Sequence, residues 1–472
     1  MSGIKKNIFW KTLQAGADAG FQFLGIILVA TLIPKKEFGH VALVLAYVVF
    51  SYLVFDFGIS KAIARYSAGV KATKKGRNFV KRSFKISLFI SMVSLFLWYS
   101  FFYLLYKGDF KTLFLLGGIG IGARVLQNTA DSILQGYEYF KFLFLNSFIT
   151  RAIGLLFLYI GAKYYSAIGA VLFLGVNPII VSIAPWIMAF KLDDSEEGTL
   201  WPDFKELFKF AFPLGVAGVM GFFYTKVDIP IIKMFWPATE VAKYEIADRI
   251  FQAPLIFCSV LAISISPISS KLFFLGKQKE LKKTAIKAGF YGFAISVPLF
   301  TLLFFFAGEI IKLILPSYQD AYSIIRILAP LIIIKALASS ILGGVLVPAG
   351  HPWVLAFLAS FGGGLNVLLD FVFIPYFGGV GAAVSTLIGH TIAGALSFLF
   401  CFKLLFSEKK EKKHEKEKDR KDSFGLPEPD ETSFCFRQDN IYSKGTSSTS
   451  SPWDALCGSI HEKECGDHRQ QD

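Results

Sequence analysis

The sequence predicts an all-α membrane protein that crosses the bilayer about twelve times, and three observations carry this prediction. Hydrophobic residues make up 54% of the 472 residues and charged residues only 18%, whereas a soluble domain carries roughly a quarter charged residues. Up to residue 406, apolar runs long enough to cross a bilayer alternate with short breaks that are often basic. Short motifs recur in the same order in the two halves of this region. We therefore expect two six-helix bundles followed by a charged tail.

A membrane-spanning helix needs about twenty mostly apolar residues. The first six such segments are Thr12–Ile33, Val41–Ile63, Ile86–Tyr106, Leu113–Leu134, Phe142–Gly161 and Ala167–Phe190. The second six are Leu207–Ile232, Ala247–Phe274, Ala288–Leu315, Ala321–Val347, Trp353–Pro375 and Val380–Phe406. The expected domains are a first bundle over residues 1–195, a second bundle over residues 196–406 and a largely disordered tail over residues 407–472.

Positive charge predicts which side of the membrane each loop faces. Basic segments lie before span one, between spans two and three and between spans eight and nine, and twelve spans put all three on one side. Loops rich in Lys and Arg stay in the cytoplasm, so both termini are expected there and the chain in the cell membrane. These loops, which face anionic membrane lipids, explain the net charge of +14, and nucleic-acid binding is not expected.

Two pairs of motifs relate the halves to each other. PKKEFGHV, starting at Pro34, and PATEVAKY, starting at Pro237, share a proline and a glutamate three residues later. IGAV at Ile168 matches VGAA at Val380. Because equivalent segments face the same side, the motifs predict a parallel repeat whose axis lies along the membrane normal. Two bundles related in this way enclose a cavity at their interface.

Several segments of the membrane part share a pattern of small and apolar residues with a known family. They are EFGHVALVLAYVVF, FDFGISKAIARYSA, DIPIIK, ATEVAKYEIADRIFQAP and GGGLNVLLDFVFIPYFGGVGAA. These segments resemble the polysaccharide-biosynthesis flippases, which belong to the multidrug/oligosaccharidyl-lipid/polysaccharide exporter superfamily. The resemblance covers roughly Lys5–Phe406 and excludes the tail. It implies a two-bundle transporter that moves a lipid-linked oligosaccharide outward by alternating access. Lipid II flippases typically have two further spans, which this sequence does not show.

Charged residues at membrane depth are costly, so each is a functional candidate. The cations expected to line the cavity and bind an anionic headgroup are Arg124, Arg151, Lys226, Lys233, Arg249, Arg326 and Lys335. A polyprenyl-linked sugar carries a phosphate or diphosphate, whose oxygens suit the planar fork of arginine. The acids expected to bind a coupling proton or Na⁺ are Asp18, Asp131 and Asp228. Structural pairs, Arg124 with Asp131 and Lys226 with Asp228, are the open alternative.

The preferred function is outward flipping of a lipid-linked oligosaccharide or polysaccharide precursor, driven by an ion gradient or the membrane potential. The nearest alternative is a cation-coupled exporter of small amphipathic compounds, whose site should be mainly acidic and aromatic. A third alternative, a membrane-embedded glycan polymerase or glycosyltransferase, should have a sizeable extracytoplasmic loop or an acidic catalytic motif. The sequence has no P-loop, no H-E-x-x-H and no G-x-S-x-G, so we expect no enzyme, no cofactor and no structural metal.

Overall fold

The computed structural model describes residues 3–73, 78–105, 110–192, 204–349 and 351–406. These residues fold into helices joined by short connections, and no strand occurs among them, which confirms the predicted all-α fold. The tail over residues 407–472, for which the sequence predicts disorder, lies outside the described residues. The predicted boundary between the two bundles, at residues 195 and 196, also lies outside them.

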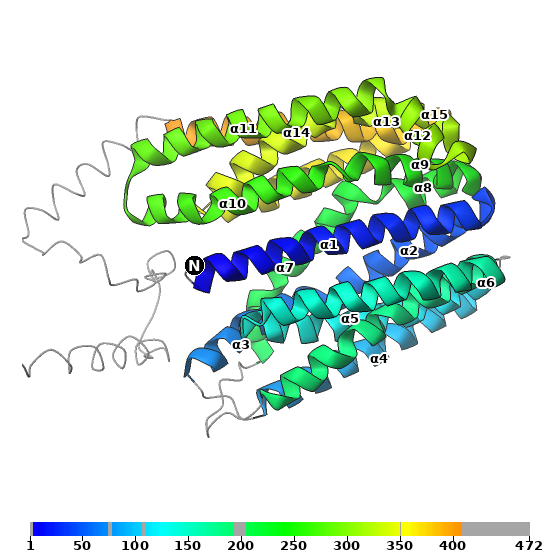
Figure 1. Ribbon diagram of the computed structural model, residues 1–472, viewed down its shortest axis with the longest axis horizontal. Helices are drawn as coiled ribbons and strands as arrows, with labels where there is room; N and C mark the ends of the chain where they lie inside the picture. The colour runs from blue at the N-terminus through cyan, green and yellow to red at the C-terminus, as the bar shows by residue number, and fades with distance from the viewer. Residues whose placement is uncertain (1–2, 74–77, 106–109, 193–203, 350, 407–472) are drawn as a thin grey trace, which may run out of the picture. The chain divides into compact units, whose positions relative to one another are not determined.

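The helices divide into two sets along the chain, and most of them lie roughly along one common axis in Figure 1. The first set contains α1 (Gly3–Leu32), α2 (Lys35–Asp56), α3 (Ile59–Thr73), α4 (Phe79–Leu105), α5 (Lys111–Gly136) and α6 (Phe140–Lys191). The second set contains α7 (Phe204–Thr225), α8 (Asp228–Phe235), α9 (Ala238–Gln252), α10 (Leu255–Phe274), α11 (Gln278–Phe305), α12 (Ala307–Ile314), the 3-10 helix η1 (Pro316–Ala321), α13 (Tyr322–Leu328), α14 (Leu331–Ala338), the π-helix η2 (Ser339–Leu346), α15 (Pro352–Cys401) and the π-helix η3 (Phe402–Phe406).

Many of these helices can cross a membrane. Among the described residues, eight helices are long and apolar enough, and the bent pair Pro316–Leu328 and Leu331–Leu346 makes a ninth if it counts as one span. Two of the eight, α6 and α15, contain 52 and 50 residues. At about 1.5 Å per residue, each is more than twice as long as the hydrocarbon core, which is about 30 Å thick. The chain is therefore a multi-pass membrane protein, and the exact number of twelve spans stays a prediction.

The two longest helices are each broken at one residue, and the two breaks are equivalent. Ser166 in α6 has φ 50° and ψ −134°, and Gly378 in α15 has φ 56° and ψ −131°. These angles are close to the first central position of a type II′ turn, a conformation that favours glycine. Ser166 lies two residues before Ile168, and Gly378 lies two residues before Val380. The breaks thus occupy matching places in the predicted repeat and divide each helix into two arms.

Other predicted spans are interrupted as well. The span Val41–Ile63 divides between α2 and α3 at Phe57 and Gly58, both of which have positive φ. The span Leu207–Ile232 divides between α7 and α8 at Lys226. Irregular backbone at membrane depth is tolerated only where it is buried in protein or lines a cavity. The breaks therefore indicate where polar groups face the protein interior.

Each half packs mainly on itself. In the first half, α5 and α6 contact each other and the remaining helices; in the second half, α15 packs on α7, α8, α13 and α14. The halves meet where α2 packs on α9 and where α3 packs on α7. In Figure 1 the N-terminus, the end of α3 and the turn between α10 and α11 lie at the same end of the helices. This placement agrees with the predicted common side of the basic segments.

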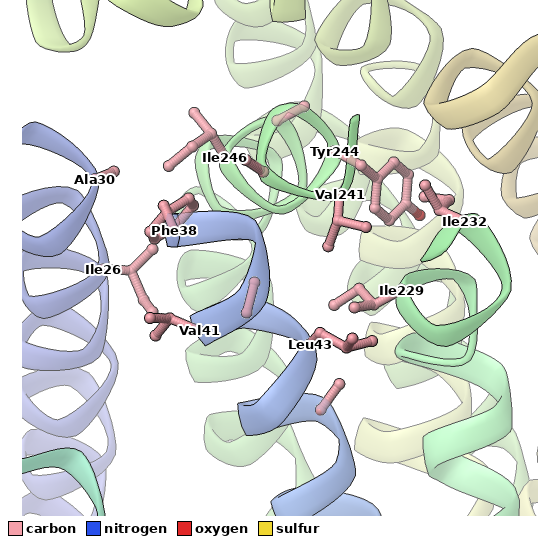
Figure 2. Packing of buried hydrophobic residues seen from close by; sticks show 14 of the residues in the cluster. Ile26, Ala30, Phe38, Val41, Leu43, Ile229, Ile232, Val241, Tyr244 and Ile246 are labelled. Carbon is pink, nitrogen blue, oxygen red and sulfur yellow. The ribbon is translucent and has the colours of Figure 1, made fainter. Parts of the chain in front are cut away.

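Apolar side chains from α1, α2, α8 and α9 fill the interface between the halves and point toward one another (Figure 2). The labelled side chains are those of Ile26, Ala30, Phe38, Val41, Leu43, Ile229, Ile232, Val241, Tyr244 and Ile246, and all of them are buried. Lipid chains are as apolar as leucine, so close packing rather than burial from water holds helices together in a membrane. The interface should therefore depend on small residues that let backbones approach.

Gly39 is such a residue. A Cβ atom built on Gly39 of α2 would stand 1.8 Å from the backbone oxygen of Ala238, the first residue of α9. Real Cβ atoms do not come so close to a carbonyl oxygen, and the neighbouring atom belongs to rigid backbone. The start of α2 can therefore contact the start of α9 only because position 39 has no side chain.

Candidate functional site

Three of the seven predicted cations line one cavity of about 200 Å³, which we call the arginine cavity. Arg124 comes from α5, Arg151 from the first arm of α6 and Arg249 from α9. The cavity therefore carries cations from both halves of the chain. Its other polar lining groups include Gln127 and Asn177, and apolar residues of α1, α2 and α6 complete the wall.

Arg124 has a guanidinium group without a counter-charge. Its Nε atom is buried and has no hydrogen-bond partner, and its side chain forms no ion pair with any described residue. The structural pair with Asp131 that the sequence left open is not formed among the described residues. A buried charge that lacks a partner destabilises the fold by several kcal/mol, because its desolvation is not offset. An anion entering the cavity would remove this penalty.

Arg151 is already partly neutralised. Its Nε lies 2.7 Å from Oδ1 of Asp18 on α1 and donates a hydrogen bond of 2.9 Å to Oγ of Ser147. The Ser147 hydroxyl in turn donates to the same Asp18 oxygen. Asp18, one of the predicted coupling acids, thus joins α1 to α6 and offsets part of the charge of the arginine.

Arg249 and Lys226 pair with two acids that the sequence had not assigned to a site, and they share one of them, Glu245. Nε of Arg249 lies 2.5 Å from Oε1 of Glu245, and Nζ of Lys226 lies 3.3 Å from Oε2 of the same residue. Lys226 also contacts Oδ2 of Asp248 at 2.7 Å. The structural pair of Lys226 with Asp228 that the sequence left open is not formed, since Lys226 pairs with two acids of α9 instead. Arg249 and Glu245 are four residues apart on α9, a spacing that could have indicated their pair, whereas the pairs of Lys226 join different parts of the chain.

Asp228 instead joins a second buried polar cluster. It accepts hydrogen bonds from the Tyr244 hydroxyl and from Nδ2 of Asn366, the latter at 2.8 Å. Nδ2 of Asn366 also donates to Oδ2 of Asp370 at 3.3 Å, and Ser385 donates to the other oxygen of Asp370. Asp228 is 2% exposed, whereas Asn366 and Asp370 are fully buried. Two carboxylates held this close favour an added proton or cation.

Asn366 adds an oxygen to this cluster that nothing satisfies. Its Oδ1 atom is buried and has no hydrogen-bond partner in the described structure. Asn366 is not among the site residues predicted from the sequence, although it lies four residues before Asp370 and so shares a helix face with it. Across the described residues, no group of three or more His, Cys, Asp or Glu side chains is placed to hold a metal ion. The cluster therefore offers a proton or a cation the two carboxylates of Asp228 and Asp370 and the uncharged amide oxygen of Asn366.

The remaining predicted cations lie elsewhere. Lys335 lines two cavities of the second half, of about 340 and 390 Å³. Lys233 is half-buried at the end of α8 and lines neither of these two cavities nor the arginine cavity. Arg326 is exposed, and its guanidinium carbon lies 5.2 Å from the ring centroid of Tyr322. The structure thus gathers Arg124, Arg151 and Arg249 and leaves Lys233 and Arg326 apart from them.

The sequence matches the family described as "Polysaccharide biosynthesis protein" over residues 4–273, which is more than half of the chain. The chain belongs to this family. Residues 213–372 also match the MatE family. The resemblance drawn from the sequence motifs is thereby confirmed, and the chain is a membrane transporter of this family.

Full-length relatives and solved structures agree with this assignment. A Haloferax volcanii protein, "Probable low-salt glycan biosynthesis flippase Agl15", is 25% identical over 384 residues, 79% of this chain and 78% of that protein. A Methanocaldococcus jannaschii protein, "Uncharacterized membrane protein MJ1068", is 24% identical over 442 residues, 85% and 84% of the two chains. A solved inward-facing multidrug resistance MATE family transporter superposes with a TM-score of 0.64 at 17% identity, covering 85% of this chain and 96% of that one. This last likeness shows the fold alone.

Proposed function

We propose that the chain flips a lipid-linked oligosaccharide, or a polysaccharide precursor, from the cytoplasmic to the outer leaflet, and that Arg124, Arg151 and Arg249 hold its phosphate or diphosphate. The observation that carries this proposal is the buried guanidinium of Arg124, which lacks a counter-charge among the described residues. The match to polysaccharide biosynthesis proteins and the likeness to a probable glycan flippase support the same function.

The balance of charges around the cavity supports an anionic substrate. Glu245 is shared between Arg249 and Lys226, and Asp18 is held by Arg151. No acid forms an ion pair with Arg124 in the described structure. A planar guanidinium can donate two parallel hydrogen bonds to a phosphate, and further arginines add to this interaction. A cationic drug would meet a positive wall at this cavity.

Placement of the cations suits alternating access. Arg124 and Arg151 belong to the first half, whereas Arg249 belongs to the second. An anion bound between them contacts both halves, so a change in their relative position changes the contacts that it makes. A ligand can shift a conformational equilibrium only by binding the two states differently. An anion held between the two halves would therefore bind the inward-facing and outward-facing states with different affinities.

The buried acids of the second half support coupling to an ion. In this proposal Asp228 and Asp370, joined through Asn366, take up one proton or one Na⁺. Two ionised carboxylates so close together repel each other, and either cation relieves the repulsion. With both termini cytoplasmic and the chain in the cell membrane, ion entry would drive outward flipping. The nearest alternative remains a cation-coupled exporter, which the MatE match favours.

The test is flipping of a fluorescent lipid-linked oligosaccharide by the purified chain in proteoliposomes. Arg124→Ala should reduce the flipping rate at least about tenfold, and Arg124→Lys should restore only part of it because lysine cannot bind two oxygens in parallel. Arg82→Ala removes an exposed arginine outside the cavity and should keep the native rate. Absence of flipping by the native chain with several such lipids would overturn the proposed function.

A further inference from the structure

A separate cavity of about 390 Å³ lies within the second half, between α10, α14, η2 and α15. Its wall is mostly apolar, with Leu255, Leu342 and Leu358 among the lining residues. It shares no lining residue with the arginine cavity. Its volume falls near the lower end of the range for small-molecule sites, which is roughly 300–1,000 Å³. The space therefore suits one apolar chain or a small ring system.

Lys335 gives this apolar cavity a positive charge. Its side chain forms no ion pair and no hydrogen bond with any described residue, and its Nζ lies 5.2 Å from the ring centroid of Phe251. Lys226, by contrast, is neutralised by two acids. The acids whose charges act on Lys335, Asp228 and Asp248, are engaged by other donors. Lys335 therefore has a cation–π contact but no anion.

His390 adds an unsatisfied acceptor at the same place. It is 1% exposed, and its Nε2 lies 3.1 Å from the backbone oxygen of Tyr224. Because a carbonyl oxygen only accepts, Nε2 carries the proton and Nδ1 is an acceptor. Nδ1 is buried and has no partner in the described part of the chain. Lys335 and His390 both line this cavity, so it offers one cation and one buried acceptor.

One wall of the cavity has an unusual backbone. Ser339, Leu342 and Gly343 line it from η2, a π-helix over Ser339–Leu346. π-Helical segments are rare and occur frequently at functional sites, because the extra residue in the turn re-aims side chains and backbone groups. The π-segment follows directly after α14, which carries Lys335.

We propose that this cavity binds a small anionic amphiphile: a carboxylate or phosphate monoester joined to a single apolar chain. The anion lies against Lys335, and the remaining hydroxyl of a phosphate monoester monoanion donates a hydrogen bond to Nδ1 of His390. The chain lies against α10, η2 and the arms of α15. This site goes beyond the flipping of a glycan lipid, because it lies in one half and uses none of the three arginines.

The test is photo-crosslinking of the full-length chain in nanodiscs of phosphatidylcholine with a diazirine-bearing twelve-carbon fatty acid, followed by mass spectrometry of the labelled peptides. Saturable labelling is expected on α10, η2 or α15. Dodecyl phosphate should compete for the site, whereas dodecanol should not, because it lacks the charge. Phosphatidylglycerol in the nanodisc should not compete either, because the cavity takes only one chain.

Three variants and one control distinguish binding at this cavity from non-specific partitioning of the probe into the membrane. Lys335→Met keeps the length of the side chain without its charge and should lower labelling about tenfold, whereas Lys335→Arg should keep most of it. Ala359→Phe fills the cavity and should also abolish labelling. Lys312→Met alters an exposed lysine and is the matched control. Thermal unfolding of each variant shows whether it is folded.

Three results would overturn the proposal. They are equal labelling of native protein and a folded Lys335→Met variant, absence of saturable labelling on the three elements, and competition by phosphatidylglycerol as strong as by dodecyl phosphate. None of these results bears on flipping by the arginine cavity, which is measured separately with Arg124 variants.

Discussion

The carboxylate of Glu240 accepts a hydrogen bond from the backbone N–H of Gly379, 3.0 Å away and directly after the break in α15. The first half repeats this contact: Glu37 accepts a hydrogen bond from the N–H of Ala167, at 3.3 Å, directly after the break in α6. Both glutamates belong to the repeated motif in which a proline precedes glutamate by three residues. The motif thus ties the start of α2 or α9 to the turn in a long helix of the same half.

A side chain at the first residue of the turn in α15 should destabilise the protein. Gly378→Ala would place a Cβ atom on a residue with φ 56° and only 3.1 Å from Oε1 of Glu240. We expect the variant to lose about 1–2 kcal/mol of stability from the backbone strain alone. Thermal unfolding in detergent measures this loss.

Gly364→Ala is the matched control, because it lies in the same helix with open space around its Cβ position. That variant should be as stable as the native chain or more stable, since alanine favours a helix by about 1 kcal/mol over glycine. A native unfolding temperature for Gly378→Ala would contradict the role assigned to the turn.

The contact between α2 and α9 should depend on Gly39. Gly39→Val cannot keep a backbone oxygen at 1.8 Å from its Cβ, so the two helices must separate at this end. Phe38, which is fully buried beside the contact, should then become accessible. A membrane-impermeant maleimide should label Phe38→Cys in the Gly39→Val background and leave it unlabelled in the native background.

This labelling requires a chain in which the five native cysteines are replaced. Gly20→Val serves as the control, because nothing lies within 4 Å of a Cβ atom at position 20. Equal labelling in the native and Gly39→Val backgrounds would show that the halves stay together by other contacts, and Gly39 would then have no part in the change of access.

Sequence reasoning predicted the features that depend on periodicity. Apolar length and the basic segments predicted a multi-pass helical protein, and the gaps expected between Gly161 and Ala167 and between Pro375 and Val380 contain the two breaks. The motif around Glu37 and Glu240 predicted a repeat. These features are local, or recur at a fixed spacing, so one chain is enough to show them.

Pairing between helices could not be predicted in the same way. Spacing shows which residues share one face of one helix, but Arg124 and Arg249 come together from different halves. Lys226 and Asp228 are close in sequence, but Lys226 lies between α7 and α8 and pairs with Glu245 of α9 instead. Asn366 carries no charge, so the criterion of charged residues at membrane depth does not select it. Tertiary packing, rather than sequence distance, selects these partners.

Asp18 limits how strongly Arg151 can hold an anion. Asp18→Asn removes the carboxylate that lies 2.7 Å from Nε of Arg151 and so makes the arginine available to a phosphate. We expect the affinity for a short-chain polyprenyl phosphate to rise by up to about tenfold. Fluorescence titration of the purified chain measures the change.

Asp320→Asn is the control for this titration, because Asp320 is 62% exposed and lies outside the cavity. Its affinity should stay at the native value. A fall in affinity for Asp18→Asn would reverse the interpretation, since it would mean that Asp18 orients Arg151 for the anion rather than competing with it.

The cluster around Asp228 should determine how flipping responds to an ion gradient. Asp370→Asn and Asp228→Asn each remove one of the two carboxylates that Asn366 joins, and a single buried acid no longer needs an added cation to offset repulsion. Proteoliposomes with an imposed Na⁺ or proton gradient should show faster flipping by the native chain with one of the two gradients. Both variants should lose this stimulation.

Comparing the two gradients identifies the coupling ion, which the buried oxygens alone leave open between a proton and Na⁺. Glu309→Gln, at an exposed acid of α12, should retain the full response. If both aspartate variants respond to the gradient as the native chain does, the cluster is structural. The energy for flipping would then have to enter elsewhere, and Asp131 of α5, which is also a coupling acid predicted from the sequence, would be the next acid to test.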